Sequence, residues 1–446
     1  MHARCAPGDT MKIVFISDAC IPSPSAEAVF VVQMAQALAD NGHQVRLLVP
    51  DRKQDRYSDL EAVAAYYGVA PAFAAQTIAW PAGTKAIRLW AWRAAQAARL
   101  EEPDLVYARH IAAGWAALAQ GLSCIVELHQ GIEGRSGLVG RLVDRADDML
   151  RQVGGRWSNR SNPARDAATR QDCRELARRG GYVQNATLLR CLAGHPRLAR
   201  VVVITHALER DLVRTAPQLA GRIQVSPDGA SLPASPPVPV AVEPGEVFHV
   251  GYCGHLYAGK GIALIATLAR QCPWARFHVV GGLEADLDYW RSATDDCANI
   301  VFHGHIEPHR VIHWLAAFDV CLLPNQPAVA TYGSARRKNA ATNIGAYTSP
   351  MKMFEYMAAG KPIVASDLAV LREVLTHDEN ALLCAHDDVR AWAGALSRLA
   401  GDAGLRERLG AAARADLKTR YTWSARARRV IADLGTETRT AESESP

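Results

Sequence analysis

Short runs of apolar residues alternate with longer stretches of mixed polarity along most of the chain. Several of the runs are continuously apolar, which is typical of strands covered on both faces. Stretches such as 26–40 and 390–399 separate the runs and have helical lengths. This alternation predicts parallel sheets joined by crossover helices. The predicted strands are 12–17, 44–49, 104–107, 123–128, 200–204 and 222–225, followed by 247–252, 276–280, 299–302, 319–323, 362–365 and 381–384.

The strand and helix pattern runs twice, and a segment rich in Pro, Ser and Gly at 226–246 separates the two runs. Such a composition predicts a linker. We therefore predict an α/β protein with two Rossmann-like parallel-sheet domains that face a central cleft. In sheets of this kind ligands bind outside the carboxyl ends of the strands. The predicted parts are a disordered leader at 1–10, a first domain at 11–228 with a helical insertion at about 135–195, a linker at 229–246, a second domain at 247–420 and a disordered tail at 436–446.

The composition is that of an ordinary globular protein. Hydrophobic residues make up 49% and charged residues 21% of 446 residues, which excludes disordered, collagen-like and disulfide-stapled classes. The ten cysteines form no CxxC pair, and the N-terminus has no secretory apolar region. No apolar run approaches the roughly 18 residues of a membrane span. We therefore expect a cytoplasmic protein, with contact at the inner face of the membrane left open.

The net charge of +5 is unevenly distributed. Residues 131–200 contain fourteen Arg, no Lys and seven acidic residues. Such a block fits a phosphate or an anionic membrane face, and it equally fits a solvated helical face. The stretch 84–100 combines Arg with Trp90 and Trp92. It fits an interfacial helix that touches lipid, and it equally fits ordinary core packing of the aromatic residues.

The string GHLYAGKGI at 254–262 follows a predicted strand and precedes a predicted helix. Glycines at such a turn let the backbone approach a ligand, the helix N-terminus favours an anion, and Lys260 adds a positive charge. The string resembles a nucleotide-binding P-loop, but Gly261 stands where that motif needs the hydroxyl that binds Mg²⁺. A glycine turn without a ligand is the other alternative.

The string SPMKMFEYMAAGKP at 349–362 predicts a short helix with clear boundaries. Ser349 is a favourable N-cap, Pro350 a favourable first residue, and Gly360 with Pro362 ends the helix. Lys352 and Glu355 are three residues apart and share a face. A carboxylate there suits a pair of ribose hydroxyls, whereas a plain surface ion pair is the alternative.

Histidines supply two further candidates. His129 follows the strand 123–128, at an edge where a side chain reaches the cleft and where an imidazole suits a sugar or a proton near neutral pH; a structural histidine is the alternative. A cluster at His303, His305, His309 and His313 has the spacing of a zinc site but lacks an acidic or cysteine partner.

Together these strings resemble family 4 of the retaining GT-B glycosyltransferases, which take sugar from a nucleotide-sugar donor. The resemblance covers most of residues 11–435 and is weakest over 135–195. It is carried by GYCGHLYAGKGI (251–262), VVGG (279–282), FHGHI…FDVCLLP (302–324), SPMKMFEYMAAGKPIVASDLAVLREVL (349–375), MKIVFISDACIPSPSAEAVFVVQMAQALADNGHQVRLLVP (11–50), VYARH…VELH (106–129) and YTWSARARRVIADL (421–434), the last being similar to a helix that returns to the first domain.

The resemblance implies roles for particular residues. Lys260 would neutralise the donor diphosphate, Glu355 would hold the ribose, and His129 would touch the donor sugar; these three are the catalytic candidates. The residues implied in substrate binding are Ser25, Ala26 and Glu27 near the phosphates or the acceptor, Gly254, His255, Gly259 and Gly281 in the glycine turns, Gly304, His305 and Ile306 at the base, and Tyr347, Ser349, Pro350, Met351 and Lys352 at the sugar and phosphates.

Three positions depart from the family pattern. His255 stands where the family often has Arg, Tyr347 replaces the first of two paired glutamates, and Ala26-Glu27-Ala28 replaces a Gly-Gly turn. Arg336, Arg337 and Lys338 are candidates to replace the lost cation.

The resemblance implies sugar transfer with retention of configuration to a polysaccharide, lipid-linked or small-molecule acceptor. The nucleotide-diphosphate-sugar is then a co-substrate, with no obligatory metal, no other cofactor and no nucleic-acid partner; peripheral membrane contact is left open. Two alternatives are a GT-B nucleotide-sugar epimerase or hydrolase, and a non-catalytic module that binds nucleotide-sugar.

Overall fold

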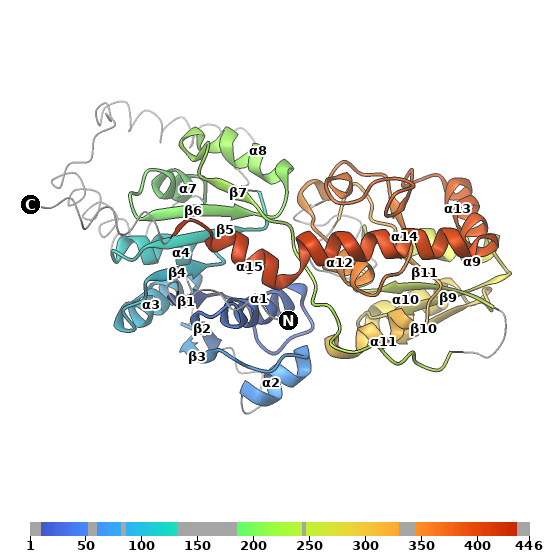
Figure 1. Cartoon of the computed structure of the whole chain (residues 1–446), viewed down its shortest axis with the longest axis horizontal. Coiled ribbons are helices and arrows are strands. Elements are labelled where there is room, and N and C mark those ends of the chain that lie inside the picture. Colours follow the sequence, from blue (N-terminus) through green and yellow to red (C-terminus); the bar gives the residue numbers. More distant parts are fainter. Residues whose placement is uncertain are drawn as a thin grey trace, which may run out of the picture.

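The computed structural model describes residues 10–51, 60–81, 86–131, 185–242, 247–329 and 345–434. Within these residues the chain forms two parallel sheets, one of seven and one of six strands, in two domains that lie side by side (Figure 1). The predicted α/β class with two Rossmann-like domains is therefore confirmed.

The first domain is built on a sheet in the order β3-β2-β1-β4-β5-β6-β7. Its strands are β1 (Lys12–Ile16), β2 (Gln44–Asp51), β3 (Ala74–Ala79), β4 (Leu105–Ala108), β5 (Cys124–Leu128), β6 (Leu198–Val203) and β7 (Ile223–Val225). Its helices are α1 (Ala26–Asp40), α2 (Leu60–Tyr67), α3 (Ala86–Leu100), α4 (Ile111–Ala119), α7 (Asn185–Ala193) and α8 (His206–Thr215).

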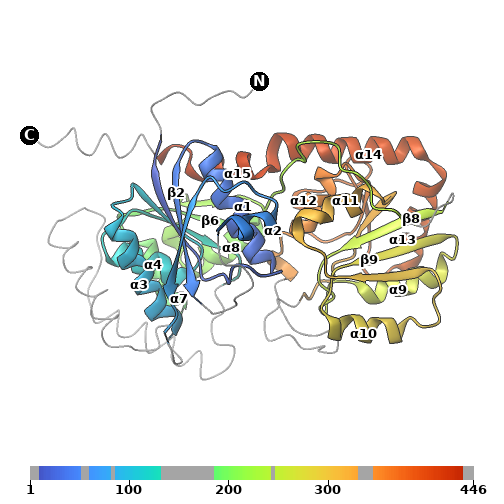
Figure 2. The ribbon, with the colours of Figure 1, turned by 90° about the horizontal axis from the view of Figure 1, so that it is seen from below.

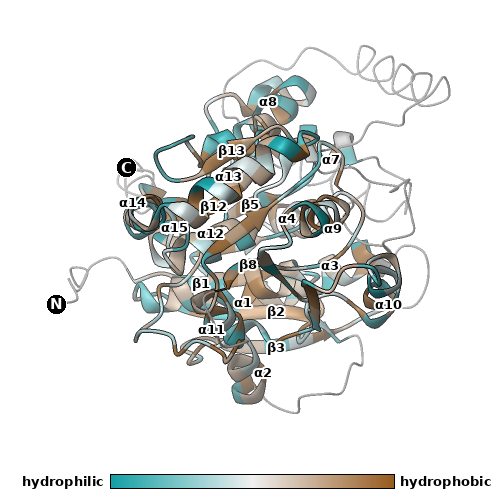
Figure 3. Ribbon diagram, turned by 90° about the vertical axis from the view of Figure 1, so that its right-hand side faces the viewer, coloured by the Kyte–Doolittle hydropathy of each residue, from teal (hydrophilic) through white to brown (hydrophobic). Residues whose placement is uncertain are grey.

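Both faces of the sheet are buried along its central strands, as their continuously apolar sequences require. Val14 and Ile16 pack toward α3, α4, α7 and α8, whereas Ile13 and Phe15 pack toward α1 and α2. Figure 3 shows that the strands are mostly apolar, whereas the helices carry both polar and apolar residues.

The second domain repeats this plan with the order β10-β9-β8-β11-β12-β13. Its strands are β8 (Phe248–Cys253), β9 (Ala275–Val280), β10 (Ile300–Gly304), β11 (Val320–Leu323), β12 (Ile363–Ser366) and β13 (Leu382–Cys384). Its helices are α9 (Ile262–Gln271), α10 (Glu284–Ala293), α11 (Val311–Ala316), α12 (Met351–Ala358), α13 (Val389–Gly401) and α14 (Ala403–Asp416). Helices α9, α10, α13 and α14 cover one face, and α11 and α12 cover the other.

The end of the chain returns to the first domain. A π-helical turn, Leu417–Tyr421, joins α14 to α15 (Trp423–Ile431), and the two helices span both domains (Figure 2). Trp423, Val430 and Ile431 pack in the same core as α1. At the crossing the Ala230 amide donates to the Tyr421 carbonyl at 3.2 Å, so the outgoing and returning chain segments lie against each other.

Two local expectations were wrong. The strand β3, with the sequence AAQTIA, was not predicted, because it is an exposed edge strand paired with β2 and carries no run of large apolar residues. Ser349 is not the N-cap of α12; the helix begins at Met351 after Pro350. The Ser349 hydroxyl instead accepts a hydrogen bond from the Asp228 amide at 3.1 Å, across the domain junction.

The tryptophans of α3 serve the core of the first domain. Trp90 is fully buried and its ring N–H donates to the Ile78 carbonyl at 3.2 Å, and Trp92 packs partly buried at the same core. These contacts favour the core-packing interpretation of this helix. Separately, none of the helices in the described ranges is both long enough and apolar enough to cross a membrane.

The returning helix is held by an ion pair that is closed to solvent. Arg426 of α15 donates to Glu127 of β5 at 2.5 Å, and the two side chains are 1% and 0% exposed. The same guanidinium donates to the carbonyls of Ser226 and Pro227, both at 3.0 Å. Arg426 thus joins the last helix to a central strand and to the start of the linker.

Replacing Arg426 by Ala leaves Glu127 buried and unpaired. We expect the free energy of unfolding in urea to fall by about 3–5 kcal/mol. Arg420→Ala is the control, because Arg420 pairs with Asp416 at the surface and such pairs contribute about 1 kcal/mol or less. An Arg426→Ala loss no larger than that of the control would contradict this assignment.

Candidate active site

Three glycines meet where strands β8, β9 and β10 end. Gly254, Gly281 and Gly304 have φ values of 143°, 111° and 76°, a region that side chains other than glycine rarely adopt. The Gly254 amide donates to the Val280 carbonyl at 2.8 Å, and the Gly281 amide donates to the Gly304 carbonyl at 2.7 Å. A Cβ on Gly281 would lie 2.3 Å from the Gly254 carbonyl oxygen. Close backbone packing thus requires glycine at this edge.

The turn that carries Lys260 is built in the same way. Gly259 and Gly261 flank the lysine with φ values of 85° and 86°. A Cβ on either would lie 2.0 Å from a carbonyl oxygen of the segment after β11, that of Ala328 or Pro324. Gly261 is also the N-cap of α9. Burial lowers the pKa of Lys260 to about 8.

Lys352 is the second cation at this edge. It lies in the first turn of α12, and its Nζ donates to the Tyr252 hydroxyl at 2.6 Å and sits 3.9 Å from the centre of that ring. A Cβ on Gly254 would lie only 2.8 Å from this Nζ. Burial, and then repulsion from Lys260, holds the pKa of Lys352 well below its usual value. The two lysines therefore share one electrostatic environment.

Glu355 lies one turn further along α12, half-buried on the same side as Lys352. Burial raises the pKa of its carboxyl, and the charge of Lys352 partly offsets that rise. The structure thus brings together Lys260, Lys352 and Glu355, with two cationic groups and one acidic group. A group of this composition attracts an anion.

His255 does not replace the missing arginine as a cation. Its side chain hydrogen-bonds to the backbone of Pro24 in the first domain, and its ring stacks on Tyr257 with 4.7 Å between ring centres. Burial, Lys260 and Lys352 together lower its pKa to about 4. His255 is therefore neutral near pH 7 and forms a contact between the domains.

The end of β10 also touches the first domain. His305 Nε2 lies 3.1 Å from the hydroxyl of Tyr66 in α2, and His309 Nδ1 lies 3.3 Å from the Tyr66 carbonyl oxygen. Ile306 packs partly buried against the core on the α12 side. Sequence reasoning missed Tyr66, which belongs to no motif.

The loop before α12 is packed against the first domain. Tyr347 joins the core beside α8, and a Cβ on Gly131 would lie 2.9 Å from its ring. Met351 packs against the core around α1. The Ser349 hydroxyl accepts a hydrogen bond from the Asp228 amide, and the next residue, Pro350, is buried. This loop of the second domain therefore forms part of the domain junction.

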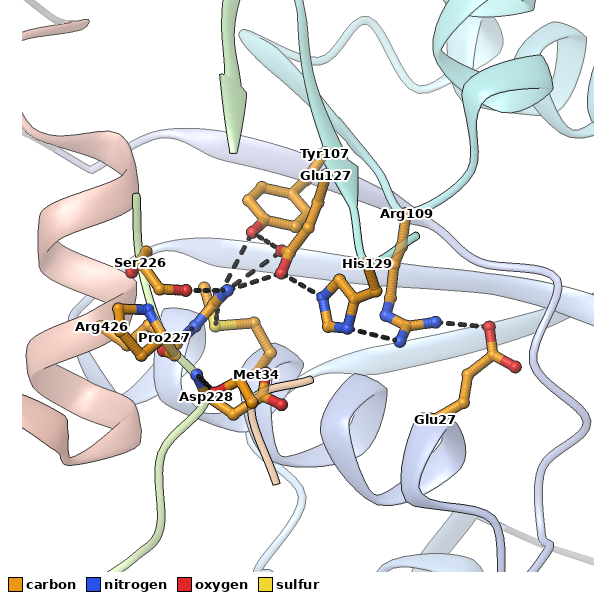
Figure 4. A network of polar contacts seen from close by, with 11 residues as sticks. Glu27, Met34, Tyr107, Arg109, Glu127, His129, Ser226, Pro227, Asp228 and Arg426 are labelled. Carbon is orange, nitrogen blue, oxygen red and sulfur yellow. Dashed lines mark hydrogen bonds and ion pairs between the residues drawn. The ribbon is translucent and has the colours of Figure 1, made fainter. Parts of the chain in front are cut away.

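His129 lies at the end of β5 in a chain of polar contacts (Figure 4). Its Nε2 lies 2.6 Å from Glu127, and its Nδ1 lies 3.1 Å from the guanidinium of Arg109. Since Arg109 can only donate, Nδ1 accepts and the proton sits on Nε2. Arg109 also pairs with Glu27 in the first turn of α1, and Tyr107 donates to Glu127.

This chain of contacts changes the expected role of His129. Burial, and then the charge of Arg109, lowers its pKa to about 4, although Glu127 opposes the shift. The imidazole is therefore expected to be neutral at pH 7, which disfavours a proton shift by His129 and favours a contact with the sugar or a structural role. For Glu127, burial opposes ionisation, but Arg426, His129 and Tyr107 outweigh it and lower the pKa to about 2.

The first-domain turn begins α1. Ser25 is the N-cap, and its hydroxyl accepts from the Ala28 amide at 3.2 Å and lies 2.8 Å from the Ser23 hydroxyl. Ala26 is the first residue of the helix, and Glu27 is occupied by Arg109.

The four-histidine cluster does not converge. His303 packs against His278 and Trp314, with ring centres 5.3 and 4.2 Å apart, whereas His313 contacts the Val238 carbonyl. No group of three His, Cys, Asp or Glu residues suited to a metal occurs in the part of the chain that the structure describes. Arg336, Arg337, Lys338 and most of the predicted Arg-rich insertion lie outside the described residues.

These features define a fold of two Rossmann-like domains, with the candidate groups at the ends of the strands. Sequence comparison assigns the family. The family described as "Glycosyl transferases group 1" matches residues 248–402, and "Glycosyltransferase Family 4" matches residues 28–232. The chain belongs to family 4 of the glycosyltransferases.

Curated relatives match parts of the chain. A D-inositol 3-phosphate glycosyltransferase of Xylanimonas cellulosilytica is 27% identical over 242 residues, which is 50% of this chain and 53% of the relative. A phosphatidyl-myo-inositol mannosyltransferase of Mycobacterium leprae is 42% identical over 91 residues, which is 20% of this chain and 24% of the relative. The chain thus spans about half the length of the first relative and a quarter of the second.

Solved structures share the whole fold at low identity. Sucrose-phosphate synthase from Thermosynechococcus elongatus has a TM-score of 0.64 at 18% identity, covering 97% of this chain and 100% of that one. Anabaena HepE in complex with UDP-glucose has a TM-score of 0.60 at 15% identity, covering 96% and 100%.

The imidazole of His129 is expected to stay neutral, with the proton on Nε2, when the pH falls from 8 to 5. Histidine-selective ¹⁵N NMR, assigned with a His129→Asn variant, measures both properties. Because the pKa lies below the unfolded value of about 6.5, only the unfolded chain gains this proton as the pH falls, so this residue lowers the unfolding free energy between those values. A midpoint near pH 6.5 would contradict the assigned network.

Proposed function

We propose that this protein is a glycosyltransferase that moves a sugar, with retention, from a nucleoside-diphosphate-sugar to a polysaccharide, lipid-linked or small-molecule acceptor. The observation that carries the proposal is the convergence of Lys260, Lys352 and Glu355 beside three tightly packed glycines. Membership in family 4 supports the same reaction class.

The two lysines receive the leaving group in this proposal. Breaking the bond between sugar and diphosphate builds negative charge on the diphosphate, and fixed cations stabilise that charge. Burial depresses the pKa of both ammonium groups while no anion is present. A bound diphosphate favours their charged forms, so its binding takes up protons from solution, in the case of Lys260 near pH 8.

The rest of the donor occupies the neighbouring groups. Glu355 accepts the two ribose hydroxyls, and the backbone at Gly304 and Ile306 lines the base. The Ser349–Lys352 loop contacts sugar and phosphates, next to the start of α12. Tyr66 of the first domain and His305 of the second, whose polar atoms lie 3.1 Å apart, cover the end of the site beside the base.

His129 acts as a fixed neutral group in this proposal. Its ring nitrogens are engaged by Glu127 and Arg109, and its side chain is 17% exposed, so its free ring edge contacts the sugar. Retention then follows from attack on the face that the diphosphate leaves, with a leaving-group oxygen taking the proton of the acceptor hydroxyl. This route requires no nucleophile from the protein.

The relatives suggest the first substrates to test. HepE was solved with UDP and with UDP-glucose, and the curated relatives are named for inositol 3-phosphate and phosphatidyl-myo-inositol. We therefore propose uridine and guanosine diphosphate-sugars as donors and inositol-type polyols as acceptors in an initial screen. A cytoplasmic location is part of the proposal, because the ten cysteines of the sequence form no CxxC pair.

Substituting Lys260 by Met removes one of the two cations. We expect kcat/KM for sugar transfer to fall about 10²- to 10³-fold, and the unfolding free energy to stay equal or to rise because a buried charge is lost. Product formation is measured by mass spectrometry. Lys12→Met is the control, because Lys12 lies at the start of β1 in the first domain and pairs there with Glu101. Full transfer activity in Lys260→Met would exclude the proposed role, and release of free sugar without an acceptor would favour a hydrolase.

Removal of divalent metal is expected to leave transfer unchanged, because Lys260 and Lys352 supply the charge at the diphosphate. The measurement compares initial rates of the wild-type protein before and after dialysis against EDTA. A loss of activity that Mg²⁺ or Mn²⁺ restores would show that the lysines do not suffice.

A further inference from the structure

One buried carboxylate at the domain junction is not used by the contacts described so far. Asp228 follows β7 at the start of the linker and is 5% exposed. Its Oδ1 is buried and has no hydrogen-bond partner in the described part of the chain. Its backbone amide, by contrast, is held by the Ser349 hydroxyl at 3.1 Å, so the residue is fixed between the domains.

The cations near Asp228 are already paired with other groups, so this carboxylate has no cation of its own. Arg426 is engaged by Glu127 and by the carbonyls of Ser226 and Pro227, and Arg109 is engaged by Glu27 and His129. With His129 neutral, the carboxylates of Glu27, Glu127 and Asp228 face two guanidinium groups. Figure 4 draws Asp228 together with this chain of contacts.

An unpaired buried carboxylate costs free energy unless something donates to it. Burial raises the pKa of Asp228 to about 7, although Arg426 and Arg109 oppose that rise. The group therefore carries its own proton or accepts a hydrogen bond from a water molecule or a ligand. A hydroxyl group suits it, because a hydroxyl donates without adding a further charge to the cluster.

We propose that Asp228 binds a sugar hydroxyl of a substrate held at the domain junction. This inference rests on the proposed function, which places a sugar between Ser349 and His129. Both neighbours connect to Asp228, Ser349 by its hydrogen bond and His129 through Glu127. The hydroxyl comes from either the donor sugar or the acceptor, and the two sources are separable by experiment.

The variant Asp228→Asn keeps the shape of the side chain and removes its charge. Because the folded pKa lies above the unfolded value, the folded state loses stability as the pH rises through about 7. We therefore expect Asp228→Asn to melt at a higher temperature than the wild type at pH 8, with a smaller difference at pH 5. A melting temperature at or above that of the wild type shows that the variant is folded, so that a loss of binding then does not come from unfolding.

Calorimetry at pH 8 compares UDP and GDP with UDP-glucose and GDP-mannose, and steady-state kinetics supplies the KM of myo-inositol 3-phosphate. We expect Asp228→Asn to weaken one sugar-bearing ligand by about 10- to 100-fold, as expected for one hydrogen bond to a charged group, and to leave UDP and GDP unchanged. The loss should shrink at pH 6, where Asp228 is protonated. Asp104→Asn is the matched control, because Asp104 precedes β4 in the first domain and accepts a hydrogen bond from the Lys12 amide there.

The outcomes are distinct. A loss confined to the nucleotide-sugar assigns the hydroxyl to the donor, and a rise confined to the KM of the polyol assigns it to the acceptor; either supports the inference. Unchanged values, or an equal loss for nucleotides and nucleotide-sugars, overturn it. A wild-type protein that binds none of these compounds overturns the proposed function itself.

Discussion

The buried ion pair between Arg426 and Glu127 is the contact on which the arrangement of the two domains depends. Neither side chain has access to water, so each charge must keep its partner. The pair fixes α15 to the centre of the first sheet, and the carbonyls of Ser226 and Pro227 bring the start of the linker to the same guanidinium. Both places where the chain crosses between domains are therefore tied to one side chain.

The same pair determines the state of His129. Glu127 stays ionised because Arg426 holds it, and an ionised Glu127 accepts the Nε2 proton of the imidazole. Arg109 then donates to the other ring nitrogen and reaches Glu27 at the start of α1. A continuous line of polar contacts thus leads from the last helix to the edge of the first domain that faces the second.

The second domain contributes two buried lysines, Lys260 and Lys352. Its strands end in glycines packed so closely that Lys352 lies against Gly254, within the influence of Lys260. Two buried ammonium groups that repel each other lower the stability of the fold, but together they favour the binding of an anion. The loop that leads into Lys352 is fastened to the first domain through Ser349 and Tyr347, so the cationic site and the domain junction share residues.

Much of this protein was predictable from the sequence, because local patterns carry the relevant physics. Continuous apolar runs separated by helices determined two parallel sheets, and the strings around Lys260 and Glu355 identified the candidate site. Only the tertiary structure decided what depends on contacts between distant residues. Arg426 and Glu127 are 299 positions apart, Tyr66 and His305 are 239 apart, and Asp228 becomes unusual only through its burial. The state of His129 belongs to this second group, since the pKa of an imidazole is set by its surroundings, and those surroundings come from strands and helices that the chain brings together only when it folds.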